Sequence, residues 1–534
     1  MTETIDIFKR RRDKAKNAWE MFLTEMRDAY AYAFPGGVSV FDAAKEREVY
    51  DAVAARAVRF RVKKIHASLF PPYKEFLDFN PADPSAADDN GEQWDKLYVE
   101  AKRNCHKAIE ASNFHTEVEM SLGDAMISYG ALALRKGTPQ NPFVFEAIHP
   151  AAIYPGRSFD GIVREMFREQ KIAGNEIRDY WPTAKADSDI LDSPQEQTVC
   201  DGYLWDVQKR EYRYIVTIND KIAVDEDHLK TAEICIFRMD GKTGDNTGFG
   251  PVLSVLPDIR SADKTKELLL RKAAFDLGGL YQAEDESIVN VESLDDLRPG
   301  TVIFKRFGSK GLESLYNGAG FDLSQMVISD LHAGIEEAIK GPSLPSENSG
   351  SRRSAYEYQV RQGEIDAVDI PTGLRLMKEM EPLFYQMLEI LTADDMADSP
   401  YYIRLPKITD KNDKEKKRLL EIVPISPMIR KQDELDSQRA LQGYALANQI
   451  DPVIASAIVD KEKFIRKILD DTAFPTECMR SEDETKTEIE RMNAAAQSAA
   501  ENREADAAVS DVERIDPENM TDAAGVMMPE GGFF

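Results

Sequence analysis

The fold is decided by residues 250–278, which read GPVLSVLPDIRSADKTKELLLRKAAFDLG. This stretch opens with Gly-Pro, closes with Gly and carries apolar residues at helical spacing in between. Those apolar residues are Val255, Ile259, Leu268, Leu269, Ala273 and Ala274. We therefore expect one long helix, whose roughly 25 residues would span about 38 Å at the α-helical rise.

A second helix is predicted for residues 323–340, which repeat apolar residues at the same spacing and stop at Gly341-Pro342. Its apolar residues are Met326, Val327, Leu331, Ile335, Ala338 and Ile339. The residues between the two helices, 279–322, are rich in turn formers and contain the strand-like runs SIVNV and TVIFKRF. The pattern predicts an antiparallel pair of helices with a small β module between them.

A polar loop follows the second helix, because residues 343–351, SLPSENSGS, have no apolar face to bury. The loop leads through Arg352 and Arg353 into a long helical run, residues 355–391. Gly363 and Pro371 interrupt this run. Proline removes a backbone donor and clashes with the preceding turn, so we expect a kink near residues 369–371.

This order of elements resembles the stem, clip, tunnel loop and kinked wing helix of phage portal proteins, the head-to-tail connectors, and specifically those of short-tailed, podovirus-type phages. Three other stretches carry the same resemblance, which extends over roughly residues 10–475. Residues 50–80 indicate a helix that passes through Leu-Phe-Pro into an aromatic strand. Residues 112–137 indicate a helix, a break at Tyr-Gly and the first strand of a hairpin. Residues 237–259 form the approach to the first long helix.

The resemblance implies an α+β, predominantly α-helical fold of the portal type, assembled as a ring. It divides the chain into an N-terminal wing region of helices and then a β-rich subdomain (1–250), an outgoing stem helix (251–278), a clip (279–322) and a returning stem helix (323–341). Apolar and polar residues alternate with a period of two over residues 143–237, which predicts short strands there. The tunnel loop (342–353) comes next, followed by the kinked long helix and a wing strand at 401–408 (together 354–429). The chain then continues with a crown of three short helices (430–480), with breaks near Asp451-Pro452 and Phe474-Pro475, and an acidic C-terminal tail (481–534). The tail has few large apolar residues, so we expect it to be largely disordered.

The tunnel loop is the candidate DNA contact that the resemblance implies. Its hydroxyl and amide groups can donate hydrogen bonds to phosphate oxygens, and its basic groups supply positive charge. The candidate residues are Lys340, Ser343, Ser346, Asn348, Ser349, Ser351, Arg352 and Arg353. Such contacts do not read base edges, so they tolerate any sequence and any rotation of a sliding duplex. The alternative is an ordinary flexible linker between two helices.

The outgoing stem helix carries charges of both signs on its exposed positions, which suits packing against copies of itself through ion pairs. The candidate residues for these contacts between subunits are Arg260, Asp263, Lys264, Glu267 and Arg271. A monomeric enzyme would have less use for such a helix.

The 534-residue chain has a net charge of −27, from 68 basic and 95 acidic side chains. Its length suggests two to four modules. A chain this acidic is a poor non-specific binder of nucleic acid, but an acidic wall gives sliding DNA few sticking points. The N-terminus has no apolar signal segment, and no apolar run approaches the length of a membrane span. The four cysteines are widely spaced, so neither a disulfide framework nor a zinc site is expected.

Motifs for chemistry are weak in this sequence. Gly241-Lys242-Thr243 ends like a phosphate-binding loop, but Ile236 stands where the motif requires a glycine, so nucleotide binding is not expected. His106 and His115 lack a third metal ligand in range, which favours a packing role. Asn113 is predicted to cap the helix that starts at Phe114. The basic cluster near the N-terminus is expected to meet acidic neighbours.

The function that the resemblance implies is that of a portal at one capsid vertex, through which double-stranded DNA is packaged and ejected, with no enzymatic activity and no cofactor or metal. The resemblance implies a ring of twelve copies of the chain and binding of double-stranded DNA without sequence specificity. The other implied partners are terminase, the major capsid and scaffold proteins, and the tail adaptor and tail proteins. No membrane is implied. The implied location is the virion at the head-tail junction, after assembly in the host cytoplasm. The alternatives are a ring or scaffold protein without a DNA channel and a nucleotide hydrolase that uses Lys242.

Overall fold

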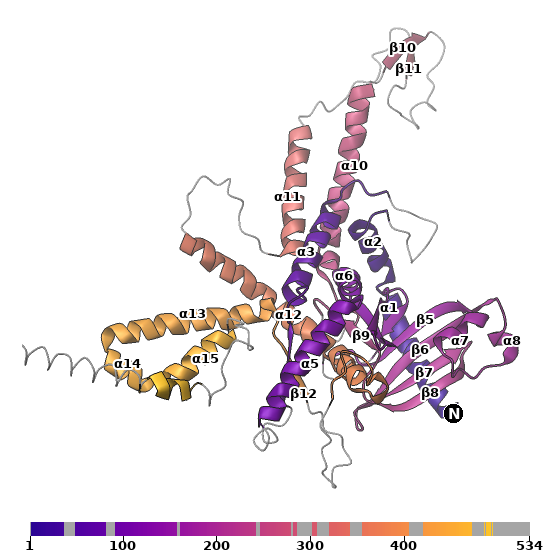
Figure 1. Cartoon of the computed structure of the whole chain (residues 1–534). Helices are drawn as coiled ribbons and strands as arrows, with labels where there is room; N and C mark the ends of the chain where they lie inside the picture. Colours follow the sequence, from indigo (N-terminus) through magenta and orange to yellow (C-terminus); the bar gives the residue numbers. More distant parts are fainter. Residues whose placement is uncertain are drawn as a thin grey trace, which may run out of the picture. The chain divides into compact units, whose positions relative to one another are not determined.

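The computed structural model describes residues 2–36, 48–81, 91–156, 161–241, 246–278, 281–285, 302–306, 320–341, 355–404, 420–471, 485, 487–492 and 494. The chain divides into two compact units, Met1–Gln438 and Arg439–Phe534. The expected α+β, predominantly helical fold is confirmed (Figure 1). No helix in the described part of the chain is long and apolar enough to cross a membrane.

The first unit begins with helices and small sheets. Its first helices are α1 (Thr2–Glu20), α2 (Leu23–Ala33), α3 (Val53–Leu69), α5 (Gly91–Ala111) and α6 (Phe114–Ala125). Strand β2 (Gly130–Thr138) lies between β3 (Asn141–Ala147) and β9 (Ile234–Phe237) in an antiparallel sheet, and β1 (Leu77–Pro81) pairs antiparallel with β12 (Leu420–Pro424).

A five-stranded antiparallel sheet forms the β-rich subdomain that the sequence predicts between residues 143 and 237. Its strands follow the chain in the order β4 (Ile153–Pro155), β5 (Met166–Ala173), β6 (Glu196–Asp206), β7 (Glu211–Ile218) and β8 (Lys221–Leu229). A 3₁₀ turn (Gly174–Glu176) and two single-turn helices, α7 (Ile177–Tyr180) and α8 (Ser188–Leu191), connect β5 to β6. They cover a small separate core that contains Ile177, Trp181 and Leu191.

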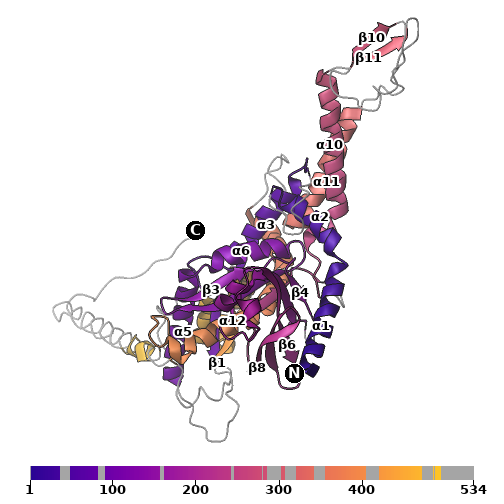
Figure 2. The ribbon, with the colours of Figure 1, turned by 90° about the vertical axis from the view of Figure 1, so that its right-hand side faces the viewer.

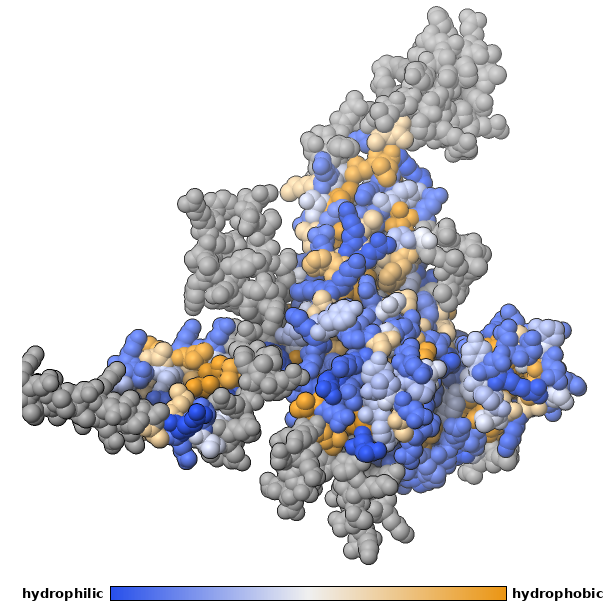
Figure 3. All heavy atoms as spheres, in the orientation of Figure 1, coloured by the Kyte–Doolittle hydropathy of each residue, from blue (hydrophilic) through white to orange (hydrophobic). Residues whose placement is uncertain are grey.

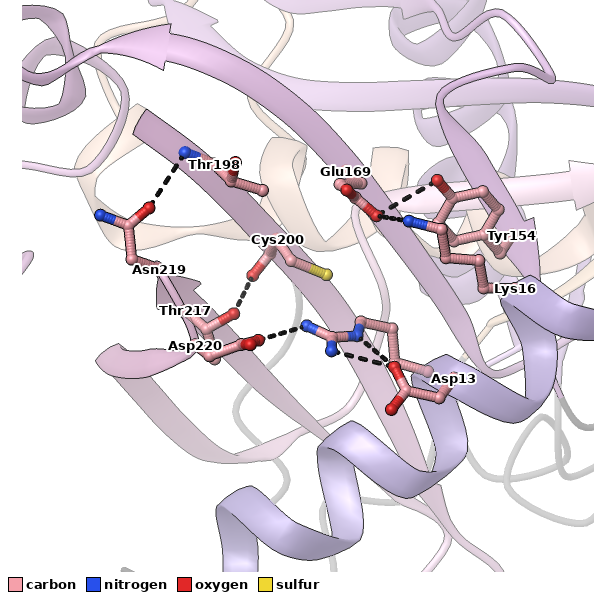
Figure 4. A network of polar contacts seen from close by, with 10 residues as sticks. Asp13, Lys16, Tyr154, Glu169, Thr198, Cys200, Thr217, Asn219 and Asp220 are labelled. Atoms are coloured by element: carbon pink, nitrogen blue, oxygen red, sulfur yellow. Dashed lines mark hydrogen bonds and ion pairs between the residues drawn. The ribbon is translucent and has the colours of Figure 1, made fainter. Parts of the chain in front are cut away.

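Helix α1 packs against this sheet and is held by both apolar and ionic contacts. Phe8 is fully buried, with its ring 5.3 Å from that of Phe167, and Trp19 lies 5.0 Å from Tyr154. Arg11 pairs with Glu165 at 2.6 Å, Arg12 with Asp220 at 2.7 Å and Lys16 with Glu169 at 2.7 Å. Figure 4 shows Asp13 and Lys16 on the helix facing the strands that carry Glu169 and Asp220, and Figure 2 shows α1 beside the sheet. The expected meeting of the basic cluster with acidic neighbours is confirmed.

The two long helices of the sequence prediction are α10 (Leu256–Gly278) and α11 (Gly320–Lys340), which lie side by side (Figures 1 and 2). The first differs from the prediction at its start, because residues Pro251–Ser254 form a separate turn of helix, α9, that ends before α10 begins. Gly250 sits in extended backbone against residues Met126 and Ile127, which fixes the entry to this segment. Between α10 and α11 the structure describes β10 (Tyr281–Asp285) and β11 (Val302–Arg306), which pair in parallel.

The predicted long helix is α12 (Ala355–Thr392), which is continuous, so Gly363 and Pro371 do not divide it. The expected kink near residues 369–371 stays a prediction. Proline costs this helix one backbone hydrogen bond, and the packing of the following turns compensates. Met380, Leu383 and Met387 of α12 are fully buried, and the helix lies against β9.

The described part of the predicted strand 401–408, residues 401–404, is not a strand, and the strand described in this region is β12. A 3₁₀ turn, Asp394–Met396, follows α12.

Helix α13 (Pro427–Ile450) crosses the boundary between the units, and α14 (Pro452–Ile458) and α15 (Lys461–Asp471) belong to the second unit. The predicted break at Asp451-Pro452 is confirmed, but the first of the three helices is long and not short. In the second unit, the rings of Tyr444 and Phe464 pack at a tilt, with their centroids 5.5 Å apart. The predicted tail, 481–534, lies outside the described residues except at 485, 487–492 and 494, which are helical.

We predict that Phe8→Ala destabilises the first unit by about 3–5 kcal/mol, because it empties a fully buried aromatic site between α1 and the sheet. The free energy of unfolding, measured by urea titration, checks this. Lys14→Ala, an exposed position on the same helix, is the matched control and should change the free energy by less than about 0.5 kcal/mol. Equal effects of the two substitutions would mean that α1 does not pack on the sheet.

Candidate functional site

The predicted tunnel loop is visible only at its first flank. Lys340 is the last residue of α11, whereas Ser343, Ser346, Asn348, Ser349, Ser351, Arg352 and Arg353 lie outside the described residues. The site that the structure describes is therefore the pair of flanks from which the loop departs. These flanks are the end of α11 and the described part of α12.

The end of α11 is fixed by a glycine. Gly341 has a φ of +77°, which L-residues with side chains rarely adopt, and its N–H donates to the carbonyl of Glu337 at 3.0 Å. A β-carbon at this position would lie 3.2 Å from Nη1 of Arg61. The glycine therefore both ends the helix and leaves room for the guanidinium beside it.

Arg61 of α3 ties the two flanks of the loop together. Its Nη2 donates to Oδ1 of Asp369 at 2.6 Å, and its Nη1 donates to Oδ2 of the same carboxylate at 2.9 Å. Nη1 also donates to the carbonyl oxygen of Lys340 at 3.2 Å. Lys64, one turn further along α3, donates to Oδ2 of Asp369 at 2.8 Å. Because Lys340 precedes the loop and Asp369 belongs to the helix that follows it, one guanidinium connects three helices. We call Arg61, Lys64 and Asp369 the clasp.

Burial makes the clasp strong. Arg61 is 8% exposed and Asp369 is 3% exposed. Burial by itself would raise the pKa of Asp369, but hydrogen bonds from Arg61 and Lys64 outweigh it and hold that pKa below the ordinary value of 3.8. A lowered pKa means that the carboxylate contributes stability above its unfolded pKa and loses it as pH falls through the lower folded value. The carboxylate of Asp369 is therefore ionised at neutral pH.

A second polar cluster joins α3 to both long helices. Asp51 is 2% exposed and accepts a hydrogen bond from the N–H of Val53 at 3.1 Å, which satisfies the start of α3. His332 of α11 hydrogen-bonds to the same carboxylate, and Lys266 of α10 lies 3.4 Å from it. Burial raises the pKa of Asp51, but these contacts outweigh it and lower that pKa overall. Both long helices are thereby attached to α3 at its start.

The predicted contact residues of the outgoing helix divide into two groups. Asp263 has a role inside the chain, since it is 6% exposed and accepts the N–H groups of Tyr50 at 2.6 Å and Asp51 at 2.9 Å. Arg260 pairs with Asp28 of α2 at 2.7 Å. Glu267 pairs along its own helix with Lys264 at 2.8 Å and Arg271 at 2.6 Å, and both basic residues are exposed. Lys264 and Arg271 present charge to the surroundings, and so does Arg260, whose side chain is 41% exposed.

The histidines singled out in the sequence pack between elements. Nε2 of His106 accepts the N–H of Phe76 at 3.0 Å, and its Nδ1 donates to the carbonyl of Lys102 at 2.8 Å. His115 lies 3.2 Å from His66, nitrogen to nitrogen. Among the described residues no group of three or more His, Cys, Asp or Glu could hold a metal ion.

Two further predictions concern polar residues near these sites. The predicted cap is wrong, because the side chain of Asn113 bonds instead to both backbone groups of Phe145, at 2.8 and 2.9 Å. Lys242 lies outside the described residues.

Sequence reasoning missed the clasp, although it left a signal. Ala54, Ala57, Val58 and Ile65 form the buried face of α3, and Arg61 lies on that same face at helical spacing. A basic residue on an apolar face requires a buried partner. The partner, Asp369, is more than 300 residues away in the chain, so its identity could not be read from local pattern.

Comparison with known families decides the identity of the chain. A family model described as "Bacteriophage head to tail connecting protein" matches residues 6–479. The chain belongs to this family. Connecting proteins of this kind are structural and in general non-enzymatic, and this one acts as the portal of a phage particle, at the junction of head and tail.

The other comparisons add little to the connector assignment. A search of curated proteins finds no match. Solved structures that match include a chain of "Virion of native gene transfer agent (GTA) particle", with 12% identity, 83% of this chain and 93% of that chain covered, and a TM-score of 0.32. Another is from "Neck of empty GTA particle computed with C6 symmetry", with 11% identity, 78% and 90% coverage, and a TM-score of 0.32. Such scores are too low to establish a shared fold, so the assignment rests on the family model.

We predict that Asp369→Ala lowers the free energy of unfolding by about 3–5 kcal/mol, because it leaves a buried guanidinium without its carboxylate. Urea titration at pH 7 checks this value. Glu336→Ala breaks the more exposed pair with Lys340 and serves as the control, with a cost below about 1 kcal/mol. If Asp369→Ala cost no more than the control, the clasp would be dispensable for stability.

Proposed function

We propose that twelve copies of this chain form a closed ring around a channel that conducts double-stranded DNA into the capsid and later out of it. The observation that carries the proposal is the family match over residues 6–479. It is supported by a pair of long helices, α10 and α11, that leads directly into a polar loop. The short-tailed type of the phage stays a prediction, as does the number of twelve.

The surface of the two long helices suits self-association. Leu268 and Leu270 on α10 are 55% and 51% exposed, and Met326 and Val327 on α11 are 73% and 45% exposed. Figure 3 shows apolar patches on this part of the molecule among hydrophilic residues. Isolated exposed apolar residues are ordinary, but several of them on one helix pair favour an interaction surface. Exposed Lys264 and Arg271 add ionic contacts to it.

The role of the loop in this proposal is to touch the duplex without reading its sequence. Arg352, Arg353 and the hydroxyl groups of the loop contact phosphates, and Lys340 stands at its base. The clasp holds the two flanks, so a load on the loop passes to α3 and the core behind it. Twelve copies together carry a charge of about −324, which keeps the rest of the channel repulsive toward DNA.

The chain performs no catalysis in this proposal, and the force for packaging comes from the terminase that docks on it. After packaging the ring holds the tail adaptor and tail proteins, and during head assembly it contacts the major capsid and scaffold proteins. Negative-stain electron microscopy of the purified protein tests the ring and the width of its channel. A ring without a channel wide enough for a duplex would favour a scaffold role, and ATP turnover by the purified protein would contradict the absence of catalysis.

We predict that Arg352→Gln combined with Arg353→Gln leaves ring formation intact and impairs retention of packaged DNA. Each lost phosphate contact also weakens the salt dependence of DNA binding by about one unit of log–log slope. Electron microscopy and a DNA-release assay on assembled particles measure the two effects. Lys461→Gln combined with Lys463→Gln removes the same charge from the second unit and is the control. Monomeric protein after the loop substitutions would refute a role confined to DNA contact.

A further inference from the structure

One face of α3 presents positive charge to the surroundings. Arg56, Arg59 and Lys63 are exposed, and Phe60 between them is 57% exposed. Their spacing of three, four and seven residues places all four on one side of the helix. The opposite side, with Ala57, Val58 and Ile65, is buried in the core. We call the four residues Arg56, Arg59, Phe60 and Lys63 the α3 basic face.

The cations of this face have no carboxylate partner in the described part of the chain. That is unusual in a protein with 95 acidic and 68 basic side chains. Three basic residues of α1 do have partners, since Arg11, Arg12 and Lys16 pair with Glu165, Asp220 and Glu169, which lie on or beside the five-stranded sheet. Lys340, whose ammonium lies 5.7 Å from the centre of the Phe60 ring, adds one more positive group beside the face.

A pocket of about 470 Å³ adjoins the α3 basic face. Arg59 and Lys63, both exposed, stand at its edge, and the buried Val58 and Val62 form its floor. Glu119 is the one carboxylate among the residues that line it. An apolar floor beneath a cationic edge is complementary to a carboxylate carried on an apolar stem, as in a glutamate or an acidic segment with apolar neighbours.

We propose that the α3 basic face and its pocket receive an acidic surface of a second copy of this chain in the ring. The inference rests on the proposed ring and specifies one of its contacts. Copies that each carry −27 repel one another, so an attractive contact must use the minority charge. The α3 basic face is a place where that charge is exposed and has no carboxylate partner among the described residues. Since contacts in a ring are heterologous, the acidic mate belongs to a different surface of the neighbouring copy.

A duplex is the less suitable occupant. The sugar-phosphate backbone offers no apolar group for Phe60 or for the floor of the pocket. Three exposed cations in each of twelve copies would also bind a sliding duplex firmly, because each neutralised phosphate releases counterions. The apolar component therefore favours a protein partner, and the net charge of the chain makes another copy the natural one.

The test variant combines Arg59→Glu with Lys63→Glu. Its control combines Lys171→Glu with Lys209→Glu, which makes the same change in charge at the five-stranded sheet. Both control residues are exposed. Sedimentation velocity over a series of protein and NaCl concentrations measures the ring. We expect the wild-type protein and the control to form rings at the same concentration, and the α3 variant to require a concentration at least about tenfold higher. Phe60→Ser should weaken assembly without changing its dependence on salt.

Thermal melting of the dissociated chains separates a lost contact from a lost fold. If the glutamate variant melts early, Arg59→Gln combined with Lys63→Gln gives the same comparison without new negative charge. Rings of the α3 variants that form at the wild-type concentration with the wild-type salt dependence would overturn the inference. So would variant rings that assemble normally but lose DNA, which would make the face a DNA contact. A wild-type protein that stays monomeric would overturn the proposed ring as well as this inference. Failure of the proposed function is thereby distinguished from failure of the α3 contact alone, in which the wild-type ring forms but the α3 variants do not impair it.

Discussion

The bidentate contact between Arg61 and Asp369 is the constraint on which the arrangement around the loop depends. A guanidinium has donors in a fixed planar fork, so it can satisfy a carboxylate with two bonds and still reach a backbone carbonyl with the same nitrogen. Here it does so at the point where α3, the end of α11 and α12 come together. Burial makes the contact rigid, because any displacement leaves charge without a partner in a low-dielectric environment. The loop therefore departs from a fixed base.

The same helix, α3, organises the first unit at both of its ends. At its start, Asp51 links the backbone of α3 to His332 and Lys266 on the two long helices. Along its length it buries an apolar face against α6 and α11. Its remaining side is the α3 basic face. One helix thus serves the core and the base of the loop with its buried face, on which Arg61 lies, and in our proposal it serves another copy with its exposed face.

The charge of the chain has a consistent physical meaning in this arrangement. An excess of acid keeps DNA from adhering to the surface, but it also makes the copies repel one another. A ring of such subunits requires local exceptions to the average charge. Within the first unit Lys16 of α1 pairs with Glu169, as Figure 4 shows, and Arg12 pairs with Asp220. By contrast, Arg56, Arg59 and Lys63 of α3 have no carboxylate partner among the residues that the structure describes. The location of unpaired basic groups is therefore more informative than the net charge.

The sequence by itself determined the elements and their order. The apolar periodicity of residues 250–278 and 323–340 predicted the two long helices, because helical spacing is a local property that neighbouring residues express without help from the rest of the chain. The alternation between residues 143 and 237 predicted the sheet in the same way. The polar loop after Gly341-Pro342 was predicted from its composition, and the pattern as a whole was enough to indicate the connector family.

The tertiary structure decided what local pattern cannot contain. Pro371 stays inside a continuous helix because packing of the following turns outweighs one missing hydrogen bond, and Asn113 bonds to a neighbouring strand because that strand lies within reach. Asp263 is drawn into the chain by two backbone N–H groups more than 200 residues away. Arg61 and Asp369 meet only when the chain is folded. Long-range polar pairs have no sequence periodicity, so the base of the loop could be found only where three distant segments come together.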